Sequence, residues 1–197
     1  MQTEGEYNEL IALTELNYVL AQLFGFARAR DEIDFAFSLG PEFRGSQDAG
    51  WNTAEEAIAA FREGMEILNS KNQDRAATRN LLYRYLCIAE AGGLYEVLGN
   101  QLSIIGSGIY KLWPFLNITE RHKPSGKIKA PNANRIFREL SERAERVGLT
   151  RFSKVLADVF DDDLRNAIAH ADFVIWPDGL RLSNEAADMR ISLRGSS

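Results

Sequence analysis

The stretch DRAATRNLLYRYLCIAEAGGLYEVLGNQLSII, residues 74–105, decides the fold class. Its apolar side chains recur at intervals of three and four residues, which is the spacing of a helix. They cover more of the helix surface than the narrow stripe of a helix on the outside of a protein. We therefore predict one long helix from Asp74 towards Ile105, at the centre of a bundle. Gly92 and Gly93 interrupt the pattern and indicate either a kink or a place where another backbone approaches closely, and we favour close packing.

Helical spacing continues towards the N-terminus. Apolar residues mark a first helix over about residues 10–24, and Thr53 with Glu56 forms a capping box that opens a second helix to about Leu68. Residues 122–131 are rich in Lys, Gly and Pro and are predicted to form an exposed loop. The sequence therefore predicts an all-α protein built as a helical bundle.

Two further helices are predicted after the loop. Asn132 or Asn134 can cap a helix that ends at Gly148, because an asparagine side chain accepts hydrogen bonds from the first free backbone N–H groups. Thr150 can cap the next helix in the same way. Both helices carry apolar residues at helical spacing and are expected to pack in the bundle.

A short helix and a small β-hairpin follow. Aspartates at 161–163 are suited to cap a helix that ends at His170. Residues 173–176 and 180–182 read as two strands, joined by a turn in which Gly179 supplies a positive φ. The predicted organisation is an N-terminal helical region over residues 1–73, a helical domain with the C-terminal hairpin over 74–185, and a tail over 186–197.

Composition narrows the functional classes. The 45% hydrophobic and 26% charged content of 197 residues is typical of a soluble globular protein, and no apolar run approaches the ~20 residues that span a bilayer. The N-terminus lacks the basic start and apolar stretch of a secretory signal. Cys87 is the single cysteine, so we expect a cytoplasmic protein without an intrachain disulfide. One cysteine and two distant histidines predict no metal site, and no cofactor motif is present.

Positive charge is concentrated in one segment of an otherwise acidic chain. The chain has a net charge of −5, yet residues 119–154 contain ten Lys or Arg against four Glu. Such a segment can attract a polyanion, because neutralised phosphates release counterions. The other interpretation is a solvated helix face with Glu–Arg pairs four residues apart. The candidate RNA contacts are Lys127, Lys129, Arg135 and Arg138.

The side chains best suited to catalysis are concentrated in the predicted short helix, which contains Arg165-Asn166-Ala167-Ile168-Ala169-His170. A helix turns ~100° per residue, so Asn166 and His170 lie one turn apart and Arg165 lies ~140° from His170 around the axis. All three side chains can therefore line the same cleft. The purely structural interpretation is that Arg165 pairs with Asp161, Asn166 bonds to Asp162, and His170 only ends the helix.

The same six residues resemble the signature of the HEPN superfamily, in which Arg, often followed by Asn, precedes His by four to six residues. The resemblance covers at most residues 74–185. It implies an all-helical domain, and many HEPN proteins are metal-independent ribonucleases of toxin or defence systems. These act as homodimers in which two copies of the motif meet. The resemblance thus implies RNA as substrate, a homodimer through the motif helix, and a possible cognate antitoxin or regulatory protein.

The resemblance also implies roles for the motif residues. His170 would move protons during attack by a 2′-hydroxyl, because the imidazole pKa lies near physiological pH. Arg165 would stabilise the phosphorane with its planar fork, and Asn166 would orient His170 or donate to the phosphate. Two alternatives stay open. One is a catalytically silent HEPN-like module that binds a nucleotide, an RNA or a protein, and the other is an interaction protein whose basic segment docks an acidic partner.

Overall fold

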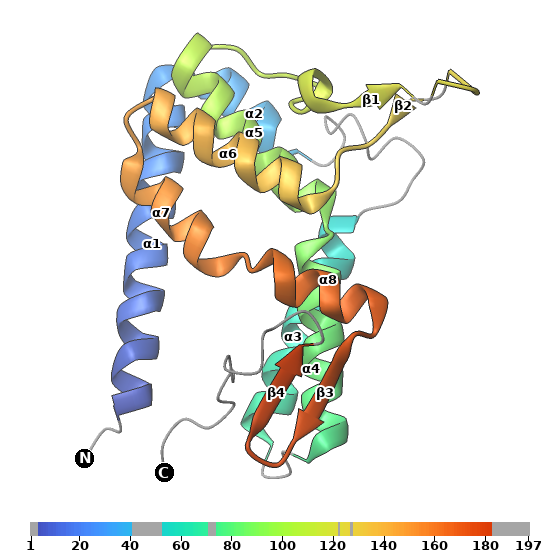
Figure 1. Ribbon diagram of the computed structural model, residues 1–197. Coiled ribbons are helices and arrows are strands. Elements are labelled where there is room, and N and C mark those ends of the chain that lie inside the picture. The colour runs from blue at the N-terminus through green and yellow to red at the C-terminus, as the bar shows by residue number, and fades with distance from the viewer. Residues whose placement is uncertain (1–3, 41–52, 71–73, 122, 127, 183–197) are drawn as a thin grey trace. The chain divides into compact units, whose positions relative to one another are not determined.

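The computed structural model describes residues 4–40, 53–70, 74–121, 123–126 and 128–182. Most of these residues are helical, and the C-terminal strands form a small antiparallel hairpin, so the all-α class with a hairpin is confirmed (Figure 1). None of the helices described is both long enough and apolar enough to cross a bilayer.

The chain forms two compact units, and each is assembled from separate segments of the sequence. We call the first the hairpin unit; it comprises the described parts of residues 1–15, 57–89 and 161–182. We call the second the helical unit; it comprises the described parts of residues 16–56 and 90–160. The predicted boundary near residue 73 falls in 71–73, outside the described residues.

The hairpin unit is built on α4 (Arg75–Ala89). Helix α8 (Asp162–His170) and strand β3 (Phe173–Trp176) pack on α4, and β4 (Gly179–Leu182) completes the hairpin (Figure 1). Their buried side chains form one apolar cluster that consists of Leu82, Ala167, Ile168, Ile175, Leu180 and Leu182. The motif helix is therefore anchored by its own apolar face.

Helix α3 (Thr53–Asn69) lies beside α4. Its buried positions in the hairpin unit are small, and a Cβ added at Gly64 would lie 3.8 Å from Leu81 of α4. Glu63 forms an ion pair with Arg84 across the two helices. The ion pair and the position of Gly64 beside Leu81 show that the two helices are neighbours.

The hairpin forms as predicted, but its turn is one residue shorter than expected, because Gly179 is the first residue of β4. Phe173 pairs with Leu182 and Trp176 with Gly179, and the two strands run antiparallel. Gly179 has a φ of 151°, a region that side-chain-bearing residues rarely adopt. The predicted role of this glycine is confirmed.

The helical unit contains the larger core. It is formed by the second part of α1 (Glu4–Arg30) with α2 (Glu32–Leu39), α5 (Gly92–Ser107), α6 (Ala133–Arg146) and α7 (Thr150–Val159). Its buried apolar residues include Val19, Leu23, Tyr95, Leu102, Phe137, Leu140, Phe152 and Leu156. The short 3-10 helix η3 (Leu116–Ile118) and the two-residue strands β1 (Glu120–Arg121) and β2 (Ile128–Lys129) connect α5 to α6.

The prediction of one continuous helix from Asp74 to Ile105 is wrong. Helix α4 ends at Ala89 and α5 begins at Gly92, with a short turn between them. A Cβ added at Gly92 would meet no atom within 4 Å, so the expected close packing is also absent at this glycine. Apolar spacing did not reveal the break because both helices keep the same three-and-four pattern across it.

The caps of the last helices agree with the sequence in two cases of three. Asn132 caps α6 by accepting a hydrogen bond from the backbone N–H of Arg135 at 3.1 Å. Asp161 caps α8 by accepting one from Leu164 at 2.9 Å. Thr150 is not a cap. It is the first residue of α7, and its hydroxyl lies 3.2 Å from a carboxylate oxygen of Glu145.

Candidate functional site

Helix α8 holds all three residues of the predicted motif and ends where the sequence suggested. The backbone N–H of Ala171 donates to Ile168 and that of Asp172 donates to Ala167, at 3.2 and 2.8 Å. This pair of bonds is a Schellman motif, with Ala171 in the left-handed region at φ 58°. The helix therefore stops directly after His170.

Arg165 and Asn166 form a joined polar pair. The Nη1 atom of Arg165 donates to Oδ1 of Asn166 at 2.7 Å, and both side chains are half-buried. The amide oxygen of Asn166 is used in this contact, while its NH₂ group remains a donor. Together the two side chains present guanidinium and amide donors, which suit the oxygens of a phosphate.

His170 is exposed at the C-terminal end of the same helix. Neither ring nitrogen hydrogen-bonds to another described residue, so the imidazole is accessible for proton transfer. It lies five positions after Arg165, which corresponds to ~7.5 Å along the axis and ~140° around it. Within one helix the two side chains therefore point in different directions.

Tyr85 anchors the start of the motif helix and was not predicted as a site residue. Its hydroxyl donates to the backbone oxygen of Asp161 and accepts from the backbone N–H of the same residue, both at 3.2 Å. Burial raises the pKa of Tyr85. The nearby charges of Asp161 and Asp162 act in the same direction, against the hydrogen bond to Asp161 and the Arg165 guanidinium. Its position in the apolar stripe of α4 made it look like an ordinary core residue.

The predicted RNA contacts are only partly free to bind a phosphate. Lys127 lies outside the described residues. Lys129 on β2 and Arg138 on α6 are exposed, whereas Arg135 is half-buried and forms an ion pair with Glu120. The register of β1 and β2 places Glu120 opposite Lys129 as well. A carboxylate therefore sits within the predicted basic surface.

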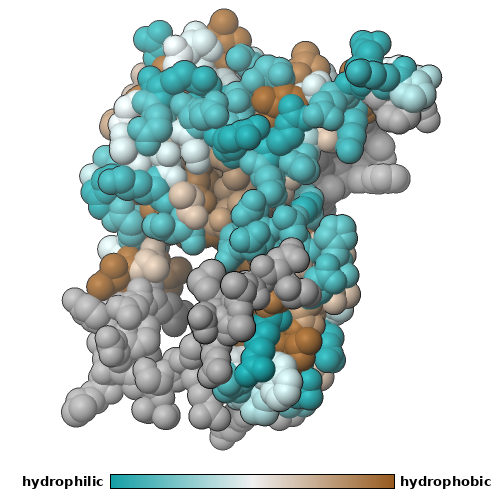
Figure 2. All heavy atoms as spheres, in the orientation of Figure 1, coloured by the Kyte–Doolittle hydropathy of each residue, from teal (hydrophilic) through white to brown (hydrophobic). Residues whose placement is uncertain are grey.

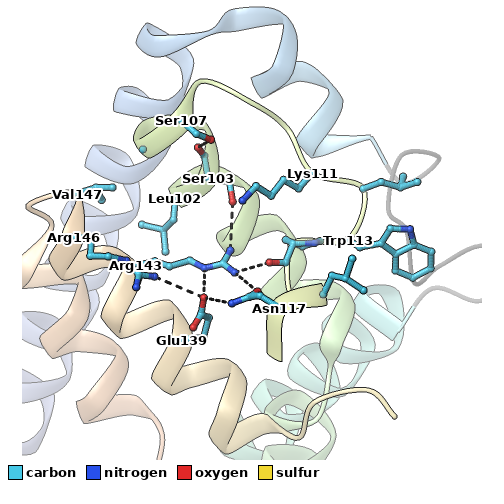
Figure 3. A pocket seen from close by; sticks show the side chains of 14 residues that line it. Leu102, Ser103, Ser107, Lys111, Trp113, Asn117, Glu139, Arg143, Arg146 and Val147 are labelled. Atoms are coloured by element: carbon cyan, nitrogen blue, oxygen red, sulfur yellow. Dashed lines mark hydrogen bonds and ion pairs between the residues drawn. The ribbon is translucent and has the colours of Figure 1, made fainter. Parts of the chain in front are cut away.

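The helical unit contains a polar network that sequence reasoning missed (Figure 3). Arg143 of α6 is 9% exposed, and its Nε donates to Oε1 of Glu139 at 2.7 Å. Its Nη2 donates to the carbonyl oxygen of Pro114 at 2.6 Å and to Oδ1 of Asn117 at 2.9 Å. Its Nη1 reaches Oγ of Ser103 at 3.4 Å. The sequence predicted only the Glu139–Arg143 pair, as part of a solvated face, and that interpretation is wrong for this pair because both side chains are buried.

Glu139 is the acidic partner of this network. Burial raises its pKa, but hydrogen bonds from Arg143 and Asn117 and the charges of Arg143 and Arg146 outweigh burial, so the pKa lies below its usual value. Asn117 donates to the same carboxylate at 2.9 Å. The carboxylate thus stays ionised and neutralises Arg143 from within the helix.

A pocket of about 950 Å³ opens beside this network, and we call it the Arg143 pocket. Its lining comes from the end of α5, the connection to η3 and the last turns of α6, and it includes Ser103, Lys111, Trp113, Leu116, Arg143 and Arg146. Hydrophilic side chains predominate over the helical unit on the face shown in Figure 2, in contrast to the exposed apolar residues Leu112, Trp113 and Leu116 at this pocket.

The described residues contain no group of three His, Cys, Asp or Glu side chains placed to hold a metal ion. What the structure brings together is a donor pair with an exposed histidine on α8, and separately a cationic pocket in the helical unit. Comparison of the chain with protein-family models, with curated proteins and with solved structures gives no match.

Proposed function

We propose that this protein is a metal-independent endoribonuclease of the HEPN type. The observation that carries the proposal is the arrangement on α8, where Arg165 contacts Asn166 at 2.7 Å and His170 is exposed one turn further on. The helix-rich fold with a motif helix packed on α4 is compatible with the resemblance. The proposal rests on the chemistry of these residues.

The chemistry of the three side chains fits strand cleavage by the neighbouring 2′-hydroxyl. A base removes the 2′-hydroxyl proton, the oxygen attacks phosphorus, and the 5′-oxygen leaves after it accepts a proton. His170 performs proton transfer, for which a positioned residue contributes ~10²–10⁴ in rate. Arg165 and the Asn166 amide donate to the non-bridging oxygens as charge builds on them. The products are a 2′,3′-cyclic phosphate and a 5′-hydroxyl.

A second copy of the chain completes the proposed site. One histidine cannot easily serve as both base and acid on opposite sides of the phosphorus, and Arg165 points away from His170 on its own helix. Across a two-fold axis, His170 of each protomer would lie near Arg165 of the other. The active species is therefore proposed to be a homodimer through α8.

The test compares wild type with His170→Ala on a single-stranded RNA in the presence of EDTA. His122→Ala serves as the matched control, because it removes the only other histidine. We expect cleavage by wild type and by the control, no cleavage by His170→Ala, and product 5′ ends that a polynucleotide kinase labels directly. Binding without cleavage by wild type would favour the silent binding module, and equal cleavage by His170→Ala would refute the proposal.

A further inference from the structure

We propose that the Arg143 pocket binds a small organic anion, a carboxylate or phosphate carried on an apolar body. The pocket has a volume of about 950 Å³, at the upper end of the range that small-molecule sites occupy. All of its lining residues belong to the helical unit, whereas the motif helix belongs to the hairpin unit. The proposal is therefore independent of the ribonuclease proposal.

The excess positive charge of the lining selects an anion. The pocket contains the cations Lys111, Arg143 and Arg146 and the single carboxylate of Glu139. That carboxylate is already held by Arg143 at 2.7 Å, and Arg146 lies 3.7 Å from it with 62% of its side chain exposed. The Lys111 ammonium makes no hydrogen bond or ion pair with a described residue. Its backbone N–H donates to Asn100 at 2.9 Å, which fixes the position from which the side chain extends.

Arg143 provides a rigid donor in the wall of the pocket. Its guanidinium carries five N–H groups, and four contacts to described residues account for only four of them. Nη1 makes a single contact, the 3.4 Å approach to Ser103, which is the weakest of the four. Because the side chain is nine-tenths buried and held at Nε and Nη2, the remaining Nη1 donor is preorganised for a ligand oxygen.

The apolar part of the lining indicates that the ligand has an apolar body as well as a charged group. Leu112, Trp113 and Leu116 are 49%, 47% and 57% exposed, and all three line the pocket. A bare phosphate would leave these side chains in water, whereas an aromatic or aliphatic body would cover them. In the view of Figure 3, Lys111 and Arg146 lie to either side of Arg143, with the Trp113 indole at one edge. The ligand class is thus an amphipathic anion rather than a simple oxyanion.

The experiment uses two fluorescent probes that differ in charge. 1-Anilinonaphthalene-8-sulfonate bears a negatively charged sulfonate group. N-phenyl-1-naphthylamine has the same aromatic rings without that group and is neutral. Both are titrated into the full chain, into Lys111→Gln/Arg146→Gln, and into the matched control Arg121→Gln/Lys154→Gln. The control removes two exposed cations of the helical unit that do not line the pocket. Circular dichroism and thermal unfolding establish that each variant is folded.

We expect the sulfonate probe to bind one site per chain, with a Kd about tenfold higher in Lys111→Gln/Arg146→Gln, since each exposed ion pair typically contributes a factor of up to about five. The neutral probe should bind both proteins equally, and Trp113→Ala should weaken both probes. Octanoate or octyl phosphate should displace the sulfonate probe while octanol does not, and the better competitor identifies the head group. An unchanged Kd, an equal loss in the control variant, or an equal loss for the neutral probe would overturn the proposal. Displacement by a short RNA at lower concentration than by either small anion would overturn it as well.

Discussion

The hydroxyl of Tyr85 bonds to both backbone polar groups of Asp161, although the two residues lie 76 positions apart. Asp161 is the N-cap of α8, so the contact fixes the start of the motif helix to α4. A capping residue orients its helix through its backbone as well as through its side chain. The position of Arg165, four residues further on, thus depends on a side chain from a distant part of the sequence.

Replacing Tyr85 with Phe should loosen this anchor. Two hydrogen bonds are lost while the ring remains, so we expect the free energy of unfolding to fall by about 1–2 kcal/mol. Hydrogen exchange at the first turn of α8 should accelerate. Tyr83→Phe is the matched control, because Tyr83 is exposed two residues away, and it should stay within about 0.5 kcal/mol of wild type. Equal effects of the two changes would argue against the anchor.

Removing the positive member of the buried network should destabilise the helical unit. In Arg143→Met the Glu139 carboxylate keeps its charge but loses its main partner, and breaking a buried pair in this way costs about 3 kcal/mol or more. The double variant Glu139→Gln/Arg143→Met removes the stranded charge and should recover part of that loss. Chemical denaturation followed by fluorescence measures both values. A double variant less stable than Arg143→Met would contradict the charge argument.

The lowered pKa of Glu139 predicts a dependence of stability on pH. A carboxyl group with a lower pKa in the folded state contributes stability that is fully present above its unfolded value of 4.5. That contribution is lost as the pH falls through the folded value. Denaturation midpoints between pH 6 and 2.5 should therefore fall more steeply in wild type than in Glu139→Gln. Glu142→Gln, which removes one exposed carboxylate of the same helix, provides the control for the loss of a single charge.

The contact between Arg165 and Asn166 predicts non-additive effects on RNA cleavage. Arg165→Lys should lose most activity because an ammonium cannot reproduce the planar fork, and Asn166→Ala should lose less. Since the two side chains act as one donor group, the double variant should be only slightly worse than Arg165→Lys alone. Single-turnover cleavage rates measure all three. Strictly multiplicative losses would mean that the two residues work separately.

RNA affinity should distinguish among the four predicted basic contacts. Lys129→Gln and Arg138→Gln should each reduce the slope of log affinity against log salt by about 0.7, the value for one single-strand phosphate contact. Arg135→Gln should change the slope less, because Glu120 already compensates this charge. The same slope is measured for Lys127→Gln, so that all four predicted contacts are compared. Filter binding over a range of salt concentrations gives the slopes, and a slope unaffected in every variant would remove this surface from RNA binding.

The sequence predicted the features that depend on neighbouring residues. Helical spacing located most of the helices, although it missed α2 and merged α4 with α5. Asparagines before an apolar stretch narrowed the cap of α6 to Asn132 or Asn134, and a glycine after the aspartate of the turn indicated the hairpin at Gly179. These signals extend over a few positions, and the local backbone decides them. The motif helix was placed correctly for the same reason, including its end at His170.

The features that the sequence did not reveal depend on residues that are distant along the chain. Arg143 looked like one half of a surface pair, because its burial is created by Ser103, Pro114 and Asn117. The hydroxyl of Tyr85 could not be assigned a partner without knowing that α8 packs on α4. No spacing rule of a single helix contains this information, which arises only when segments meet.

The interleaving of the two units along the chain also has a consequence for synthesis on the ribosome. Helix α4 emerges early, yet Leu180 and Leu182 of the cluster that covers it are made some 100 residues later, after the whole of the helical unit. Because a chain emerges from its N-terminus, the helical unit can form its core first. The apolar face of α4 stays exposed until the residues that cover it have been made. A chain truncated between residues 160 and 182, and arrested after a C-terminal linker long enough to fill the ribosome exit tunnel, should therefore show a protease-resistant helical unit and a cleavable α4. Folding of the motif helix would be the last event in the maturation of this protein.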